Sequence, residues 1–252
     1  MIGAIIGDIV GSRFEFANAT TTKFDLFDGY CDITDDTICT VAIADAAMTD
    51  KDYRSALLHW CRKYPFPKGG YGGRFSAWLN SADPQPYNSF GNGSAMRVSP
   101  VAWLFSGLSM VREQAEATAA VTHDHPEGIK GARVIAECIY LLRRGHTKSE
   151  ILSLVKKEYG SIPKFTPFSN RFDETCMNAV PVAVSCFLES TSFESAIRNA
   201  ILIGGDSDTI GAITGSLAEA FYEIPKDIAD KALCYLPADI SFVVRGFYKK
   251  IN

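Results

Sequence analysis

The sequence predicts an all-α protein from two kinds of pattern. Apolar residues recur with the helical period in several segments, as at Ile129, Ala132 and Ala136, whereas convincing alternating strands are absent. Residues that favour a helix start precede several of these segments, as Ser192 does. We therefore expect roughly ten helices. No shift in composition marks a linker, so we expect a single domain over residues 1–252.

Composition narrows the class of protein. Hydrophobic residues make up 47% of the 252 positions, which is enough for a substantial core. The formal net charge of -4 offers no basic surface to nucleic acid or to an anionic membrane. No run of about 20 apolar residues occurs, and the apolar N-terminal segment carries Asp8 without a basic start, so we expect neither a membrane span nor a signal peptide. The seven cysteines are scattered without a C-x-x-C pair, which indicates a reduced, cytoplasmic protein.

Three glycines near the N-terminus predict a helix that another backbone approaches closely. Gly3, Gly7 and Gly11 are four residues apart and therefore stack on one side of a helix. Each glycine costs about 1 kcal/mol relative to alanine inside a helix, so three on one face indicate a packing requirement. We expect this helix at the centre of the bundle, where it supports the functional site.

Two pairs of aspartates stand at predicted helix starts. The first aspartate pair is Asp35 and Asp36, and the second aspartate pair is Asp206 and Asp208. One carboxylate at a helix N-terminus is favoured by roughly 0.3–1 kcal/mol without any function. Two neighbouring carboxylates repel and raise each other's pKa unless a cation intervenes. The residues alone therefore leave two interpretations, which are helix-capping aspartates and a metal site.

The metal interpretation makes a specific prediction about the ion. If the two helix starts converge, two divalent cations would neutralise the charge of the two aspartate pairs. Every candidate ligand is an oxygen, with hydroxyls from Thr34, Thr37 and Thr209, and neither segment contains histidine or cysteine. Oxygen ligands suit magnesium or manganese and argue against zinc.

Loop segments provide further candidates. Residues 89–97, "SFGNGSAMR", form a glycine loop whose backbone N–H groups can approach an anion, although Gly-Asn-Gly is equally good turn chemistry. His123 stands at a predicted helix start, where a histidine is more often a capping or packing residue than a catalyst. Turn-forming residues are dense over 65–94 and 160–172, and long ordered loops of this kind are often functional.

Five segments, in this order along the chain, resemble motifs of the ADP-ribosylglycohydrolase family, which includes dinitrogenase reductase-activating glycohydrolase and the ADP-ribosylarginine and ADP-ribosylserine hydrolases. They are "GDIVGSRFEF", "TDDT", "GNGSAMRVSP", "THDHPEG" and "GGDSDTIGAITG". The resemblance implies a compact orthogonal helical bundle of the ADP-ribosylglycohydrolase type. It also implies a dinuclear metal cleft that binds ADP-ribose and two divalent cations, Mg²⁺ or Mn²⁺.

Carried over position by position, the resemblance assigns three sets of residues. The metal ligands that it implies are Thr34, Asp35, Asp36, Asp206, Asp208 and Thr209. The residues that it places against ADP-ribose, with Phe90 at the position of an aromatic that stacks on adenine, are Ser89, Phe90, Gly91, Asn92, Gly93, Ser94 and His123. The catalytic residues that it implies, with Glu15 at the position of a mobile glutamate near the metals, are Glu15, Asp35, Asp36 and Asp208.

We therefore expect a metal-dependent hydrolase that cleaves the glycosidic bond at C1 of the distal ribose of ADP-ribose. Its partner would be an ADP-ribosylated protein or a small ADP-ribosyl conjugate, and the leaving group stays open among arginine, serine, O-acetyl and nucleic-acid linkages. The acidic net charge disfavours nucleic acid. No sequence pattern defines an oligomeric state.

Two alternatives remain at this point. One is a magnesium-dependent nucleotide phosphohydrolase, although all-α enzymes of that class typically space glutamates along helix interiors, whereas the acids here are aspartates at helix starts. The other is a non-catalytic ADP-ribose-binding protein of the same fold. Such a protein is free to lose metal ligands, yet every position of the two aspartate motifs is intact here.

Overall fold

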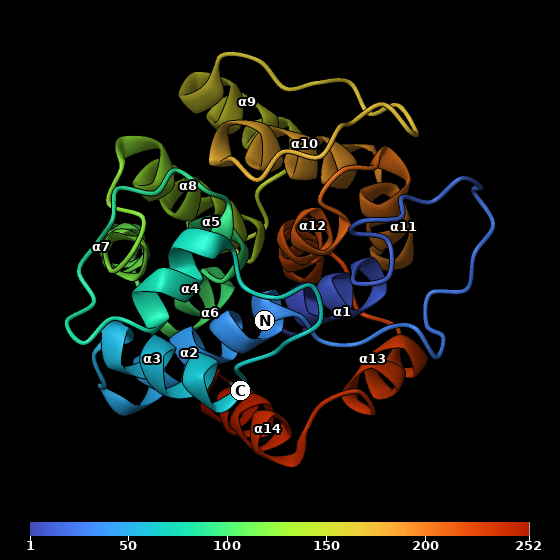
Figure 1. Cartoon of the computed structure of the whole chain (residues 1–252). Coiled ribbons are helices and arrows are strands. Elements are labelled where there is room, and N and C mark those ends of the chain that lie inside the picture. The colour runs from blue at the N-terminus through green and yellow to red at the C-terminus, as the bar shows by residue number, and fades with distance from the viewer. Residues whose placement is uncertain (252) are drawn as a thin grey trace.

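The computed structural model describes residues 1–251, which form an all-α bundle (Figure 1). These residues contain fourteen helices and no named strand, so the all-α prediction is confirmed. The expected number of about ten helices was too low, because three helices of seven, four and six residues are shorter than the window in which a helical period is recognised. The helices are α1 (Ile2–Gly11), α2 (Asp35–Thr49), α3 (Tyr53–Lys63), α4 (Gly73–Leu79), α5 (Gly93–Met96), α6 (Ser99–Leu104), α7 (Leu108–Ala120), α8 (Pro126–Leu142), α9 (Lys148–Tyr159), α10 (Cys176–Glu189), α11 (Phe193–Ile203), α12 (Ser207–Phe221), α13 (Lys226–Leu233) and α14 (Ala238–Ile251).

Helix α1 lies at the centre of the bundle, and its glycine face packs directly on α12 (Figure 1). A Cβ atom added to Gly7 would overlap the backbone of Gly211 and lie 2.7 Å from the amide nitrogen of Ala212. In return, a Cβ atom on Gly215 would lie 2.8 Å from the carbonyl carbon of Gly3. The two backbones are therefore in contact along the crossing, which confirms the close approach predicted from the glycine spacing.

This contact extends to the start of α12. A Cβ atom on Gly11 would lie 2.6 Å from the amide nitrogen of Asp208, so the end of α1 is in direct contact with the first turn of α12. Helix α2 begins beside them, after Thr34, whose side chain accepts a hydrogen bond from the backbone N–H of Asp36 at 3.2 Å. Helix α1 thus brings the two aspartate pairs to one place.

Two loop segments meet on the other side of the helix starts that carry the aspartate pairs. The backbone N–H of Asn92 donates to the carbonyl oxygen of Glu174 at 2.7 Å, and that of Cys176 donates to the carbonyl oxygen of Phe90 at 3.0 Å. The glycine loop is therefore fixed to the segment that precedes α10. The bridge joins segments that are more than 80 residues apart in the chain, since the Cys176 thiol also donates to Gly91 across 85 positions.

The remaining expectations about composition and domains can now be compared with the structure. Within residues 1–251, no helix is long and apolar enough to cross a membrane. All seven cysteines are free, and only Cys234 among them is exposed, so most act as small buried hydrophobes. A single domain over residues 1–252 stays a prediction, and Asn252 lies outside the described residues.

The α1–α12 contact predicts a large difference between two glycine substitutions. Gly7→Ala should lower the free energy of unfolding by about 3 kcal/mol, because the added methyl group must push two backbones apart. Gly246→Ala on α14, where an added Cβ meets nothing within 4 Å, should raise it by about 0.5–1 kcal/mol through helix propensity. Urea unfolding of both variants checks this, and a Gly7→Ala protein as stable as the wild type would contradict the described contact.

Candidate functional site

A cleft of about 380 Å³ opens over the starts of α2 and α12, and its volume is typical of small-molecule sites. It brings together most of the site residues expected from the sequence, although they come from distant parts of the chain. Those that line it are Glu15, Asp35, Asp36, Ser89, Gly91, Asn92, Gly93, His123, Asp206, Asp208 and Thr209.

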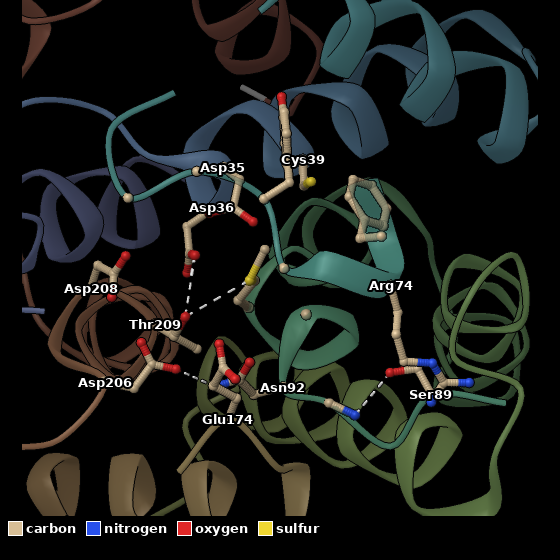
Figure 2. A pocket seen from close by; sticks show the side chains of 18 of the residues that line it. Asp35, Asp36, Cys39, Arg74, Ser89, Asn92, Glu174, Asp206, Asp208 and Thr209 are labelled. Atoms are coloured by element: carbon tan, nitrogen blue, oxygen red, sulfur yellow. Dashed lines mark hydrogen bonds between the residues drawn. The ribbon is translucent and has the colours of Figure 1, made fainter. Parts of the chain in front are cut away.

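At one end of the cleft lie Glu15 and the two aspartate pairs, which we call the acidic cluster. Figure 2 shows the four aspartates around the starts of α2 and α12, with Glu174 beside Asn92. One carboxylate oxygen from each of Glu15, Asp206 and Asp208 lies within 4.8 Å of the others. The hydroxyl group of Thr209 on α12 donates to Oδ2 of Asp36 on α2 at 3.2 Å. The two helix starts therefore converge, as the metal interpretation of the sequence required.

Asp8 is a buried acid behind the acidic cluster that the sequence analysis did not assign to the site. Its Oδ2 accepts hydrogen bonds from the backbone N–H groups of Thr34 and Thr37, both at 3.1 Å, and from the Thr37 hydroxyl. Its Oδ1 accepts the Thr34 hydroxyl at 2.8 Å. These bonds join α1 to the first turn of α2. The sequence did contain a signal for Asp8, since it is an acid inside an otherwise apolar, glycine-faced helix. We used that signal only as an argument against a signal peptide.

Burial raises the pKa of all the carboxyl groups at this end of the cleft, and neighbouring charges raise it further for Asp8, Glu15, Asp35, Asp36 and Asp206. Burial is the largest cause in each case, and the charge of Asp208 is the next for Asp8, Glu15, Asp36 and Asp206. The pKa of Asp8 rises to about 7 and that of Glu15 to about 8. Asp208 is therefore the group whose charge the other acids feel most strongly.

The unpartnered oxygens test whether these residues fit a divalent cation. Glu15 Oε2, Asp36 Oδ1 and Asp208 Oδ1 are buried and have no hydrogen-bond partner among the described residues. A buried carboxylate oxygen without a partner is costly unless the group is neutralised or coordinates a metal. The surrounding donors are oxygens, which suit a hard cation such as Mg²⁺ or Mn²⁺. The residues fit such an ion.

The other end of the cleft carries hydrogen-bond donors, with Arg74 and Ser89 away from the acidic cluster in Figure 2. The Ser89 hydroxyl accepts a hydrogen bond from the backbone N–H of Gly91 at 3.1 Å, which shapes the glycine loop. The ring of His123 lies against Gly93 because this residue lacks a side chain, since an added Cβ would lie 3.1 Å from Nε2 of His123. This end suits an acceptor-rich or anionic group.

Three of the site residues that the resemblance assigns are not part of the cleft lining, and neither is Thr37, whose hydroxyl donates to Asp8. Thr34 is buried as the N-cap of α2, and Ser94 is buried while its hydroxyl donates to the carbonyl oxygen of Gly128 at 2.7 Å. Phe90 is 41% exposed, and its ring packs edge-on against His125 with the centroids 5.3 Å apart. The roles that the resemblance implies for these three residues stay predictions.

Several lining residues were missed by the sequence analysis. Most of them come from loops with no motif of their own, whereas Arg74 lies on α4 and Arg97 ends the glycine-loop segment 89–97. They lie in or next to the turn-rich segments 65–94 and 160–172, and their density of turn formers was the only signal. The clearest examples are Gly69, Tyr71, Arg74, Tyr87, Arg97 and Glu174.

Comparisons with known proteins agree with this geometry. The sequence profile of the family described as ADP-ribosylglycohydrolase matches residues 1–233. The chain is 26% identical to the ADP-ribosylhydrolase ARH3 of Danio rerio, over 89% of this chain and 82% of that protein. It is 23% identical to the ADP-ribosyl-[dinitrogen reductase] glycohydrolase of Rhodospirillum rubrum, over 88% and 84% of the two chains. A solved structure titled "ADP-ribosylglycohydrolase-related protein complex" aligns with a TM-score of 0.76 at 22% identity, over 100% of this chain and 96% of that one, which confirms the expected fold.

The raised pKa values predict how the stability of the metal-free protein depends on pH. Because the pKa values of Asp8 and Glu15 rise from 3.8 and 4.5 to about 7 and 8, the folded state binds more protons than the unfolded state between these limits. The free energy of unfolding should therefore fall as the pH rises from about 5 to about 8. Asp208→Asn removes the main repelling charge and should raise the free energy of unfolding by about 1–2 kcal/mol at about pH 8.

Urea unfolding in the presence of a chelator, repeated across this pH window, measures both effects. Added Mg²⁺ should stabilise the wild-type protein at the upper pH limit and have little effect on Asp208→Asn. A metal-free wild-type protein that becomes more stable as the pH rises would show that the acids are not held as close and as buried as described.

Proposed function

Because the chain belongs to the ADP-ribosylglycohydrolase family, we propose that it is a metal-dependent hydrolase that cleaves the glycosidic bond at C1 of the distal ribose of ADP-ribose. Its substrate is an ADP-ribosyl group on a protein side chain or on a related small conjugate. The observation that carries the proposal is the convergence of the two aspartate pairs at one end of a cleft whose other end is a glycine loop. The scattered free cysteines support a cytoplasmic location.

We assign two divalent cations, Mg²⁺ or Mn²⁺, to the acidic end of the cleft. When bound, they would orient the ribose hydroxyls and lower the pKa of a bound water, which are recognised roles of catalytic ions. The unpartnered oxygens of Asp36 and Asp208 support this assignment. The proposed ligands are Thr34, Asp35, Asp36, Asp206, Asp208 and Thr209.

Glu15 is proposed as the residue that moves a proton. In the metal-free protein, burial and the charge of Asp208 raise the pKa of Glu15 to about 8, and its Oε2 has no hydrogen-bond partner among the described residues. The group has room there because Gly69 lacks a side chain, since a Cβ at that position would lie 2.5 Å from Oε2. Glycosidic cleavage requires an acid that protonates the leaving group and a base that activates water. The unpartnered Oε2 supports the proposal that Glu15 supplies one of these two roles.

The glycine loop and His123 are proposed to hold the rest of ADP-ribose. The loop residues are Ser89, Phe90, Gly91, Asn92, Gly93 and Ser94. One hydrogen bond joins this loop to the acidic cluster, because the side-chain amide of Asn92 donates to Oδ2 of Asp206 at 2.6 Å. A fixed separation between the two ends of the cleft positions C1 when the pyrophosphate is bound remotely, and such positioning lowers the barrier.

Calorimetry of the metal-stripped protein with ADP-ribose tests the site. Binding should require added Mg²⁺ or Mn²⁺ and should disappear in Asp35→Ala and Asp208→Ala. Asp227→Ala is the matched control, since Asp227 is also an acid in the first turn of a helix but is exposed and outside the cleft. ADP-ribose binding to the control alone among the three variants is the expected result, and loss of binding in all three would contradict a specific site.

Turnover of a panel of arginine-, serine- and O-acetyl-linked ADP-ribose tests the reaction. Glu15→Gln should still bind ADP-ribose but lose activity by at least about 100-fold, because it cannot give up or accept the proton. Unchanged turnover in that variant would remove Glu15 from the mechanism. Release of phosphate from nucleotides would favour the phosphohydrolase alternative, and binding without turnover of any linkage would favour the non-catalytic one.

A further inference from the structure

A chain of three buried side chains runs beneath the donor end of the cleft. The Arg97 guanidinium donates through Nη2 to the carbonyl oxygen of Thr118 at 2.9 Å and to the hydroxyl oxygen of Thr122 at 2.8 Å. The Thr122 hydroxyl oxygen lies 2.7 Å from Nδ1 of His123. Arg97, Thr122 and His123 are 1%, 0% and 5% exposed, so solvent does not compete for these bonds.

Counting protons along this chain fixes the direction of each hydrogen bond. A guanidinium group only donates, so the Thr122 oxygen accepts from Arg97 and must use its single hydrogen elsewhere. Among the described residues, the only acceptor in reach of that hydrogen is Nδ1 of His123. The hydrogen of Thr122 is satisfied only if Nδ1 accepts it, which assigns the proton of a neutral His123 ring to Nε2.

The surroundings of His123 keep the ring neutral. Burial lowers its pKa well below the usual value, and the positive charges of Arg97 and Arg74 lower it further. A second proton on Nδ1 would also face the Thr122 hydroxyl, whose own hydrogen would then lose its acceptor. The ring therefore carries one proton, and the hydrogen-bond chain decides which nitrogen holds it.

His123 is one of the residues that line the cleft, and its Nε2 edge lies beside the glycine loop. A Cβ atom added to Gly93 or Gly91 would lie 3.1 Å or 3.4 Å from Nε2, so the ring edge lies against the part of the glycine loop that has no side chains. Within residues 1–251, no hydrogen bond is made by Nε2. We propose that Arg97 and Thr122 are positioning residues that hold His123 with its Nε2–H directed at a phosphoryl oxygen of the bound ADP-ribose.

This proposal rests on the proposed function for the identity of the ligand, but the direction of the hydrogen-bond chain does not depend on it. With the proton on Nδ1 instead, the lone pair of Nε2 would face the phosphoryl oxygen and repel it. The Thr122 hydroxyl thus determines whether His123 attracts or repels the ligand. Arg97 holds the Thr122 hydroxyl in place, since the Nη2 atom that donates to it is itself fixed by a second bond to the Thr118 carbonyl.

The first measurement is the ¹⁵N spectrum of the protein labelled in its histidine rings and saturated with Mg²⁺, without ADP-ribose. The chain has four histidines, and the His123→Gln variant identifies the signals of His123. We expect an unprotonated Nδ1 and a protonated Nε2 in the wild type and in Thr122→Ser, which keeps the hydroxyl group. Thr122→Val should show a mixture of the two tautomers.

A wild-type ring with its proton on Nδ1, or a doubly protonated ring at neutral pH, would overturn the proposal. So would a Thr122→Val protein whose His123 keeps the single Nε2–H tautomer, because the hydroxyl would then not be what holds it.

The second measurement compares affinities by calorimetry. Thr122→Val should bind ADP-ribose about tenfold more weakly, the cost of losing one well-directed hydrogen bond, while Thr122→Ser keeps wild-type affinity. The affinity for Mg²⁺ should be the same in the wild type and in both Thr122 variants, because the hydrogen-bond chain of Arg97, Thr122 and His123 lies outside the acidic cluster.

Equal ADP-ribose affinity in the valine and serine variants would overturn the positioning role, and so would a parallel loss of Mg²⁺ affinity, which would reveal general damage to the cleft. A wild-type protein with the expected tautomer that binds no ADP-ribose under any metal condition would contradict the proposed function while supporting the hydrogen-bond chain.

Discussion

The direct backbone contact between α1 and α12 is the constraint on which the rest of the structure depends. Because Gly7 and Gly211 leave no room for side chains, the register of the two helices is fixed to within a fraction of a turn. The same contact ends at Gly11, against the first turn of α12, and so determines where the second aspartate pair lies. From the adjoining side of the same turn of α1, Asp8 holds the first turn of α2. One helix therefore aligns both halves of the acidic cluster.

That alignment conflicts with stability, because it gathers acids where water cannot screen them. Two features of the fold reduce the cost. Both aspartate pairs stand at helix N-termini, where the exposed N–H groups and the helix dipole favour negative charge. Asp8, the most enclosed acid, accepts four hydrogen bonds. The unpartnered oxygens of Asp36 and Asp208 have no such relief, so the fold leaves its remaining electrostatic strain at the atoms assigned to the cations.

The parts of this site that could be predicted from sequence are those with a local cause. The aspartate pairs stand at helix starts, and their repulsion is evident from adjacent positions alone. Asp8 could not be assigned, because its partners lie 26 and 29 positions away and an acid in an apolar helix does not reveal what it bonds. The same holds for Arg97, which reaches Thr122 across 25 positions. The glycine spacing was readable because a face of small residues has one simple physical use, whereas a buried hydrogen-bond chain depends on the complete fold.

The two ends of the cleft are also coupled through charge. At the donor end, the lining combines neutral donors, namely the Ser89 hydroxyl, the neutral ring of His123 and the backbone of the glycine loop, with the guanidinium groups of Arg74 and Arg97. The two guanidinium groups attract a diphosphate, whereas the carboxylates at the acidic end repel it, and both interactions are strong in a poorly screened cleft. Cations at the acidic end would neutralise the carboxylates and so remove their repulsion of the diphosphate, apart from any contact with the ribose. A requirement for metal in ADP-ribose binding would then have two separate causes, ligation of the sugar and neutralisation of the acids. The hydrogen bond from Asn92 to Asp206 joins the glycine loop to the acidic cluster, so the two ends of the cleft keep a fixed separation.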